Sequence, residues 1–181
     1  MNRIKAKRIL IVNPFGIGDV LFTTPMVRGL REAYPDATLG YLCNRRVDEL
    51  VRTNVHLDLI FIFEKDEYRT LWRRSKKECL RMFFRFLKEI RSQRFDVLMD
   101  LSLGWHYSFL GWLLGIPTRI GFNYRRRGRF LTKSKSFRDL RRNMWCNTME
   151  SFWVFWEFLP QRRLIWSSIL PKKTVCGRGT F

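Results

Sequence analysis

The sequence predicts an α/β domain with a Rossmann-like architecture, an open parallel sheet with helices on both faces. Three observations predict this fold. Short apolar segments alternate along the chain with segments that have the apolar period of a helix. The short segments are apolar on both faces, as in strands that helices cover on both sides. The 181 residues, 46% of them hydrophobic, are enough for one domain with a sizeable core.

Five segments have the composition and length of buried strands: 8–13, 37–43, 56–63, 95–101 and 118–122. The first is rich in β-branched residues and stops at Pro14, which cannot continue a central strand. A helical segment separates most of these strands from the next. That order is typical of a parallel sheet, because parallel neighbours need a crossover connection.

Apolar residues at helical spacing predict five helices: 19–34, 47–54, 68–93, 107–115 and 143–159. Pro35 ends the first pattern, and Pro25 lies inside it. We therefore predict that this helix begins near Thr24, with Thr23 or Thr24 as its N-cap and Pro25 at its first position.

The regular pattern fades toward the C-terminal end. The basic segment 123–137 is predicted to be a loop, and the short run LIWSSIL is consistent with one more strand. We assign residues 1–160 to the domain and residues 161–181 to an atypical tail or truncated linker.

The charge balance points to anionic partners. The chain has 35 Lys and Arg against 16 Asp and Glu, a net charge of +19. Nucleic acid, a phospholipid surface and a phosphorylated substrate all fit this excess. Much of it lies in three clusters: Arg73-Arg74-Lys76-Lys77, Arg125-Arg126-Arg127-Arg129, and Lys133 to Arg142. They are either solvated faces or binding sites for phosphate. Aromatic side chains are interleaved near the first cluster: Trp72, Phe83, Phe84 and Phe86. They either belong to the core or enter a membrane interface.

Metal binding and membrane spanning have little support in the sequence. The four cysteines are widely separated, none has CxxC spacing, and the two histidines lie far from them. This pattern favours free thiols in a reducing cytosol over a zinc site. The basic N-terminus leads into an apolar run of only five residues, which we interpret as a strand rather than a signal peptide. No run reaches the roughly 20 apolar residues of a membrane span.

The loop GIGD after the first strand raises the question of a phosphate site. Ligands of an open parallel sheet gather beyond the carboxyl ends of its strands, where this loop is predicted to lie. It lacks the lysine of a Walker loop, and Leu21 takes the third glycine position of a dinucleotide fingerprint. An NADP site, with Arg45 and Arg46 on the 2′-phosphate, stays open as an alternative. So does a tight turn in which the glycines only relieve backbone strain.

Asp19 offers a different use for the loop. It would stand in the first turn of a helix, where the helix dipole stabilises a carboxylate, beside glycines that let a substrate approach. A carboxylate there can accept a proton from a substrate hydroxyl as a general base. An ordinary N-terminal helix acid is the alternative interpretation of the same residue.

The segment from Ile9 to Asn44, ILIVNPFGIGDVLFTTPMVRGLREAYPDATLGYLCN, resembles the opening of glycosyltransferase family 9, the ADP-heptose:lipopolysaccharide heptosyltransferases. The matching elements are Gly18-Asp19, Thr23-Thr24-Pro25 and the pattern LRxxYPxA. Further along, RFDVLMDLS (94–102) and GIPTRIGF (115–122) resemble two strands of the family. Each match is modest, but together they occur in the right order over about 150 residues.

The resemblance implies a glycosyltransferase of GT-B architecture, of which this chain would be the N-terminal, acceptor-binding half. It implies inverting, metal-independent transfer of a heptose from ADP-heptose to a lipopolysaccharide inner-core acceptor, with no cofactor. Asp19 would be the catalytic base. The residues expected to shape the substrate site are Asn13, Gly16, Gly18, Thr23 and Thr24.

The resemblance also implies partners and a location: a lipid A–Kdo type acceptor, a cytoplasmic enzyme, and an anionic surface on the inner face of the inner membrane. The family runs to roughly twice this length, so a chain without the donor half is expected to be inactive alone.

The family often has Gln where Ser102 stands, and a more basic pair in place of His106-Tyr107. We expect Ser102 and His106 to contact substrate, with a surface histidine at the helix start as the alternative for His106. An RNA-binding module is the remaining rival function, because aromatic residues beside arginines suit single strands. However, no RRM, KH or helix-turn-helix pattern is present.

Overall fold

A single parallel sheet forms the centre of the domain, in agreement with the predicted fold. The computed structural model describes residues 6–123 and 128–136. Its sheet has six strands in the order β3-β2-β1-β4-β5-β6, and every neighbouring pair is parallel. The strands are β1 (Arg8–Val12), β2 (Thr38–Cys43), β3 (Leu59–Ile62), β4 (Val97–Asp100), β5 (Thr118–Asn123) and β6 (Lys133–Ser136). The first five confirm the predicted strands.

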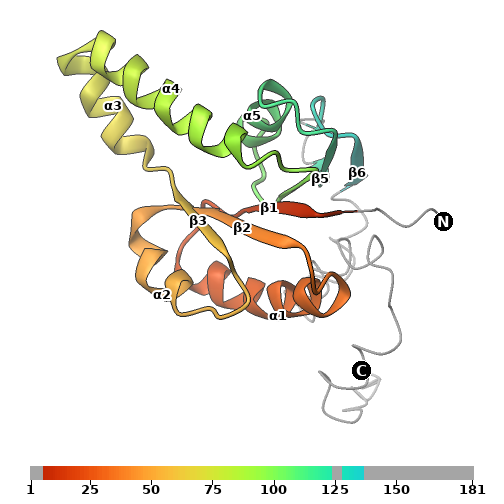
Figure 1. Cartoon of the computed structure of the whole chain (residues 1–181). Helices are drawn as coiled ribbons and strands as arrows, with labels where there is room; N and C mark the ends of the chain where they lie inside the picture. Colours follow the sequence, from red (N-terminus) through yellow and green to blue (C-terminus); the bar gives the residue numbers. More distant parts are fainter. Residues whose placement is uncertain (1–5, 124–127, 137–181) are drawn as a thin grey trace, which may run out of the picture.

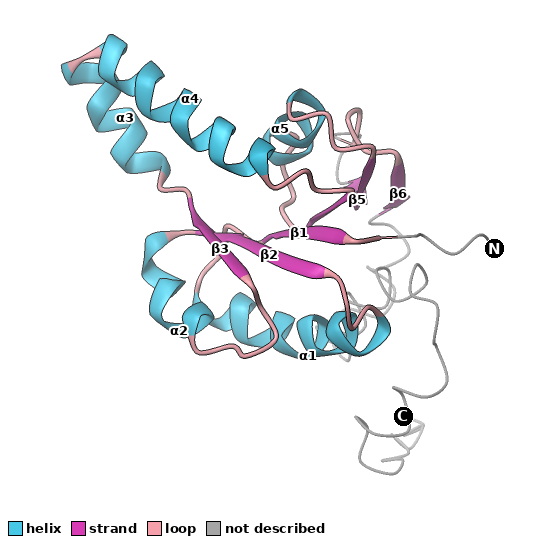
Figure 2. Ribbon diagram, viewed as in Figure 1, coloured by secondary structure: helices cyan, strands magenta, loops and turns pink. Residues whose placement is uncertain are grey.

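Helices cover both faces of this sheet, as Figure 2 shows. They are α1 (Ile17–Ala33), α2 (Asp48–Arg52) after a short 3₁₀ turn at Arg45–Val47, α3 (Lys65–Arg74), α4 (Lys76–Ser92) and α5 (His106–Leu113). Alternate residues of β1 divide between the two cores. Ile9 and Ile11 pack with α1 and α2, whereas Leu10 and Val12 pack with α4 and α5. Strand β1 is therefore apolar on both sides.

The start of α1 differs from the prediction. The helix begins at Ile17, and Pro25 lies inside it. Neither threonine is its N-cap, because the Thr23 and Thr24 hydroxyl groups both donate to the Val20 carbonyl, at 2.7 and 3.4 Å. A proline inside a helix removes one hydrogen bond to the carbonyl four residues earlier. That carbonyl belongs to Leu21, whose side chain is 53% exposed, so water can reach this side of α1.

Two further elements differ from the sequence prediction. The segment predicted as one helix over 68–93 is two helices, because Ser75 is extended and its hydroxyl accepts a hydrogen bond from the Glu78 N–H at 3.3 Å. That hydroxyl is the N-cap of α4. Strand β6 lies within the predicted basic loop. It is polar because it is an edge strand, which needs only backbone pairing with β5.

The predicted helix at 143–159, the strand in LIWSSIL and the tail at 161–181 lie outside the described residues. Within the described residues, no helix is both long and apolar enough to cross a bilayer.

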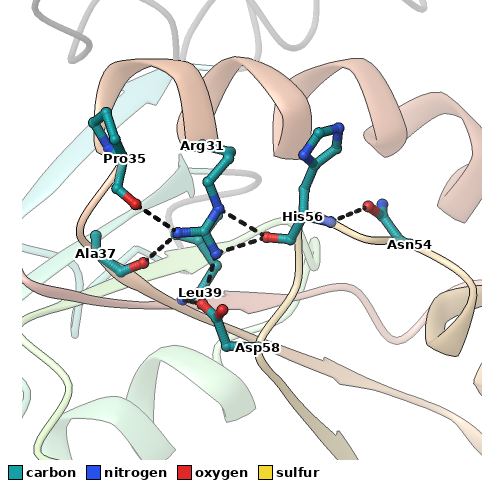
Figure 3. Close-up of polar contacts among 7 residues, drawn as sticks. All are labelled: Arg31, Pro35, Ala37, Leu39, Asn54, His56 and Asp58. Atoms are coloured by element: carbon teal, nitrogen blue, oxygen red, sulfur yellow. Dashed lines mark hydrogen bonds and ion pairs between the residues drawn. The ribbon is translucent and has the colours of Figure 1, made fainter.

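Arg31 joins three segments at the C-terminal end of α1 (Figure 3). Its guanidinium donates to the carbonyls of Pro35 at 3.0 Å and Ala37 at 2.7 Å, both in the α1–β2 connection. It also donates to the His56 carbonyl at 2.9 Å and pairs with Asp58 at 2.6 Å, both before β3. The same Asp58 oxygen accepts the Leu39 N–H of β2 at 2.7 Å. The helix, β2 and β3 are thus held together at the amino edge of the sheet.

Candidate functional site

The carboxyl edge of the sheet has its switch point between β1 and β4. From β1 the chain passes through α1 to β2 on one side, and β4 follows β3 only after the chain has crossed to the other side of β1. Val12 lies opposite Asp100 in the register, so the loops that follow β1 and β4 leave from neighbouring positions. In open α/β sheets ligands bind at such a point. The structure therefore brings the GIGD loop and the segment of Ser102 and His106 to the same part of the edge.

Asp19 lies in the first turn of α1, and its side chain is exposed. No hydrogen bond or ion pair engages its carboxylate within the part of the chain that the structure describes. The N-cap of α1, Gly16, has an extended backbone and gives no side-chain cap to the first N–H groups. The helix start thus presents an accessible carboxylate beside donors that have no partner within the helix.

Gly16 and Gly18 leave open space beside Asp19. A methyl group added at either position would meet no atom within 4 Å. Gly16 has φ −81°, and Gly18 shows no left-handed φ, so the backbone does not require glycine at either position. The alternative in which these glycines only relieve strain therefore has no support. Their small size instead keeps the surface next to Asp19 accessible.

A buried polar cluster lies beneath this loop. The Asn13 amide donates to the Tyr41 hydroxyl at 3.0 Å and to the Asp19 carbonyl at 3.4 Å. Thr23 lies 2.8 Å from the same hydroxyl, and its own proton goes to the Val20 carbonyl. Burial raises the pKa of Tyr41 to about 12, so this phenol stays protonated and acts as a hydrogen-bonding group only.

Asn13 and Thr23 accordingly face inward, with 1% and 3% of their surfaces exposed. They fix the first turn of α1 on the sheet. Their side chains do not face the site, and they affect it only by positioning the backbone of that turn. Thr24 is exposed, and both threonines line a hollow of about 320 Å³ between α1 and the segment that leads from α2 to β3.

The opposite side of the switch point contains a buried carboxyl group. Asp100 is 1% exposed; its Oδ1 accepts the Ser102 N–H at 2.9 Å, and its Oδ2 accepts the Ser108 hydroxyl at 2.5 Å. Burial raises the pKa of Asp100 to about 6, and the hydrogen bonds from the two serines limit that rise. Asp100 thereby joins the end of β4 to α5 and shapes the loop between them.

Ser102 and His106 lie on this loop. Ser102 is 5% exposed, and its hydroxyl donates to the Gly104 carbonyl at 3.4 Å. Its side chain therefore stabilises the conformation of the loop. His106 is the first residue of α5 and is exposed, and its ring stacks on Trp105 with centroids 4.4 Å apart. Of the two, His106 is the one that a ligand can reach.

Of the two arginines behind the NADP alternative, Arg45 is engaged within the protein, and its neighbour Asn44 holds the loop after β1. The Asn44 amide donates to the Phe15 carbonyl at 2.9 Å and to the Pro14 carbonyl at 3.3 Å, which fixes the loop after β1 against β2. The Arg45 guanidinium pairs with Glu67 at 2.8 Å. This pair raises the pKa of Arg45. Asn44 therefore has a structural task, and a phosphate would compete with Glu67 for Arg45.

Four residues near the site were not predicted from the sequence: Tyr41, Asn44, Asp100 and Ser108. A signal for Asp100 was present, because an acid inside an apolar strand needs buried partners. Among the described residues, no group of three or more His, Cys, Asp and Glu side chains could hold a metal ion. Cys43 and Cys79 are buried free thiols, and burial raises the pKa of Cys43 to about 12.

Comparisons with known proteins point to one group of enzymes, although no protein-family model matches the chain. It is 25% identical to "Lipopolysaccharide heptosyltransferase 3" of Escherichia coli over 110 residues, which are 61% of this chain and 31% of that protein. A solved glycosyltransferase of family 9 from Veillonella parvula has 22% identity and a TM-score of 0.56, over 74% of this chain and 38% of that one.

A third relative is the E. coli heptosyltransferase WaaC, solved with ADP-2-deoxy-2-fluoro heptose. It has 14% identity and a TM-score of 0.65, over 93% of this chain and 50% of that one. The matched part of the chain thus spans 31% to 50% of the length of these proteins. These matches support the resemblance seen in GIGD and the segments that follow it. The chain is heptosyltransferase-like, similar in sequence and in fold to the N-terminal part of glycosyltransferase family 9.

Proposed function

We propose that this chain is the acceptor-binding side of a heptosyltransferase in lipopolysaccharide biosynthesis, with Asp19 as its catalytic base. The observation that carries the proposal is the exposed Asp19 carboxylate in the first turn of α1, at the switch point of the sheet, in a chain that matches heptosyltransferases. A general base must be accessible to the proton that it removes, and this carboxylate is.

In the proposed reaction Asp19 accepts the proton of an acceptor hydroxyl as that oxygen attacks the anomeric carbon of the heptose. The new glycosidic bond forms as the bond between that carbon and the ADP oxygen breaks, so that ADP leaves and the configuration inverts. A carboxylate base needs no metal for this step. Gly16 and Gly18 give the acceptor room to approach, and the Asn13–Tyr41–Thr23 cluster holds the turn that presents Asp19.

The donor is proposed to be ADP-heptose. One solved relative was bound to ADP-2-deoxy-2-fluoro heptose, and this chain covers half of that protein. We infer that the nucleotide is bound by a part of the enzyme that these 181 residues do not provide. The glycine loop of this chain then serves the acceptor, which agrees with its lack of a phosphate-binding lysine.

The acceptor is proposed to be a lipid A–Kdo type molecule, which is anionic and anchored in a membrane. The net charge of +19 suits such a molecule. His106 and the loop after β4, across the switch point from Asp19, are proposed to contact its sugar. The enzyme would then work in the cytoplasm, at the inner face of the inner membrane.

The test uses a chimera of this chain with the part of E. coli lipopolysaccharide heptosyltransferase 3 that it does not match. Heptose transfer from ADP-heptose to Kdo–lipid A is measured for the parent and for Asp19→Asn. We expect Asp19→Asn to lower kcat by about 10²–10⁴-fold, the usual contribution of a general base. The matched control is Asp36→Asn, an exposed acid beyond the other end of α1, which should leave kcat within about twofold of the parent.

Normal kcat in Asp19→Asn would refute the assignment of the base. The chain of residues 1–181 is assayed beside the chimera. Because catalysis needs donor and acceptor held together, it should bind Kdo–lipid A and transfer no heptose. Transfer by the chain alone would show that the donor does not require another part of the enzyme.

A further inference from the structure

The helical hairpin α3–α4 extends beyond the sheet on the side of β3 (Figure 1). No residue of α3 is buried. The inner side of α4 is fixed by Phe86 and Ile90, at 7% and 1% exposure, and by Phe83, whose ring meets Tyr68 of α3 edge-on at 6.1 Å. Two of the interleaved aromatic residues, Phe83 and Phe86, thus belong to the packing of the hairpin.

The outer side of α4 is apolar at its centre and basic around it. Leu80 and Phe84 are 45% and 63% exposed, one helical turn apart. Four exposed cations share their side of the helix: Lys77, Arg81, Lys88 and Arg91. At 100° per residue these six side chains lie within an arc of roughly 100°. We call these six residues the α4 outer face.

Acidic residues are kept off the α4 outer face. Glu78 and Glu89, the acids of α4, lie about 120° or more around the helix from Phe84. Among the described residues, none of the four cations of the face is in an ion pair. Over 65–92 there are ten Lys or Arg against four Asp or Glu, and one of these acids, Glu67, is paired with Arg45. No ion pair among the described residues therefore neutralises the positive charge of the face.

Trp72, at the end of α3, adds a third exposed apolar side chain near the tip of the hairpin. It is 47% exposed, and the Lys76 ammonium lies 5.8 Å from the centre of its ring. An indole next to a cation is typical of side chains that sit at the boundary between water and lipid headgroups.

We propose that the α4 outer face, with Trp72, is the surface by which this protein binds an anionic lipid bilayer. In this arrangement Leu80, Phe84 and Trp72 enter the headgroup boundary, and the four cations contact lipid phosphates. Charge complementarity argues for this occupant, because a second copy of the chain would bring two positive faces together. The inference deepens the proposed function, since a membrane-anchored acceptor has to be met at the membrane, but its test does not depend on sugar transfer.

The test measures cosedimentation of the purified chain with vesicles of phosphatidylcholine that contain phosphatidylglycerol, against vesicles of phosphatidylcholine alone. Neither contains a sugar acceptor. We expect binding only to the anionic vesicles and release at high salt. Leu80→Ser/Phe84→Ser and Lys77→Glu/Lys88→Glu should each bind at least about tenfold more weakly, since a bilayer interaction of this kind needs both the apolar and the basic side chains.

Matched controls separate the face from general effects of charge and polarity. Leu21→Ser/Phe22→Ser removes an exposed Leu–Phe pair from α1, with 53% and 48% exposure. Lys7→Glu/Arg46→Glu makes the same change of charge at two exposed cations outside the hairpin. We expect both controls, and Asp19→Asn, to bind vesicles within about threefold of the parent. Thermal unfolding of each variant checks that the fold is kept.

Equal loss in the hairpin variants and their controls would overturn the inference, as would equal binding to neutral vesicles. A parent that binds single-stranded RNA through these residues and ignores vesicles would assign the face to nucleic acid instead. If the vesicle result holds while Asp19→Asn stays active in the chimera, the proposed reaction fails and the membrane face stands. If Asp19→Asn loses heptose transfer in the chimera while the hairpin variants bind vesicles as well as the parent does, the proposed reaction stands and the proposed membrane face is wrong.

Discussion

Replacing Arg31 with alanine should destabilise the domain more than replacing any other charged side chain of α1 with alanine. The Arg31 side chain is 22% exposed and donates to three carbonyl groups besides Asp58. A hydrogen bond to a charged group contributes about 1.5–3 kcal/mol, and such contributions do not add fully. Asp58 is 45% exposed, so its ion pair with Arg31 adds no more than about 1 kcal/mol. We expect a total loss of about 3 kcal/mol.

The assay is urea unfolding followed by tryptophan fluorescence. A loss of about 3 kcal/mol corresponds to a fall in Tm of roughly 6–12 °C for a chain of this size. Arg28→Ala is the matched control, because Arg28 makes a single pair with Glu32 on the exposed side of the same helix. It should cost no more than about 0.5 kcal/mol. If the two variants unfold within about 0.5 kcal/mol of each other, the guanidinium does not hold α1, β2 and β3 together as argued.

Three further predictions concern the sheet and its carboxyl edge. Tyr41→Phe should cost about 1–3 kcal/mol by urea unfolding, because the buried Asn13 amide loses the nearer of its two acceptors. Gly40→Ala should cost about 1–3 kcal/mol, since its Cβ would lie 2.7 Å from the ring of Phe95, whereas Gly18→Ala should be neutral or stabilising by up to about 1 kcal/mol. Burial raises the pKa of Asp100 from 3.8 to about 6, so the unfolded state loses this proton first and the contribution of Asp100 to stability falls as pH rises between these values. The stability of the parent relative to Asp100→Asn should therefore fall by about 2 kcal/mol from pH 4 to pH 7, and a flat difference would contradict this.

The strands were predictable because their signal is local. An apolar segment such as 8–13 that is buried on both faces needs no knowledge of its neighbours, and all five predicted strands are present. Strand β6 gave no such signal, because its alternating Lys and Ser residues have no apolar pattern and it joins the sheet through backbone pairing with β5. The break at Ser75 was readable as a capping pattern, Ser75 followed three residues later by Glu78, but the apolar period of α4 runs past it.

The start of α1 was mispredicted because a local rule was outweighed by tertiary contacts. Pro25 favours a helix start at its own position, yet Val20 and Thr23 are buried against the sheet and Asn13 holds the Asp19 carbonyl. Packing about two more turns of helix compensates for the hydrogen bond that proline removes. The result matters for the site, because a helix that begins at Ile17 has Asp19 in its first turn, where the general-base hypothesis placed it.

The candidate site depends on strand order, and strand order cannot be predicted from the sequence of any single segment. The sequence placed Asp19 and Ser102 after different strands, and parallel strands put both at the carboxyl edge. Whether they meet depends on β4 lying beside β1 instead of beyond β3, and that depends on the long crossover through α3 and α4. The same crossover carries the α4 outer face. The element that brings the two loops to one switch point is therefore also the element that we propose to rest on the membrane.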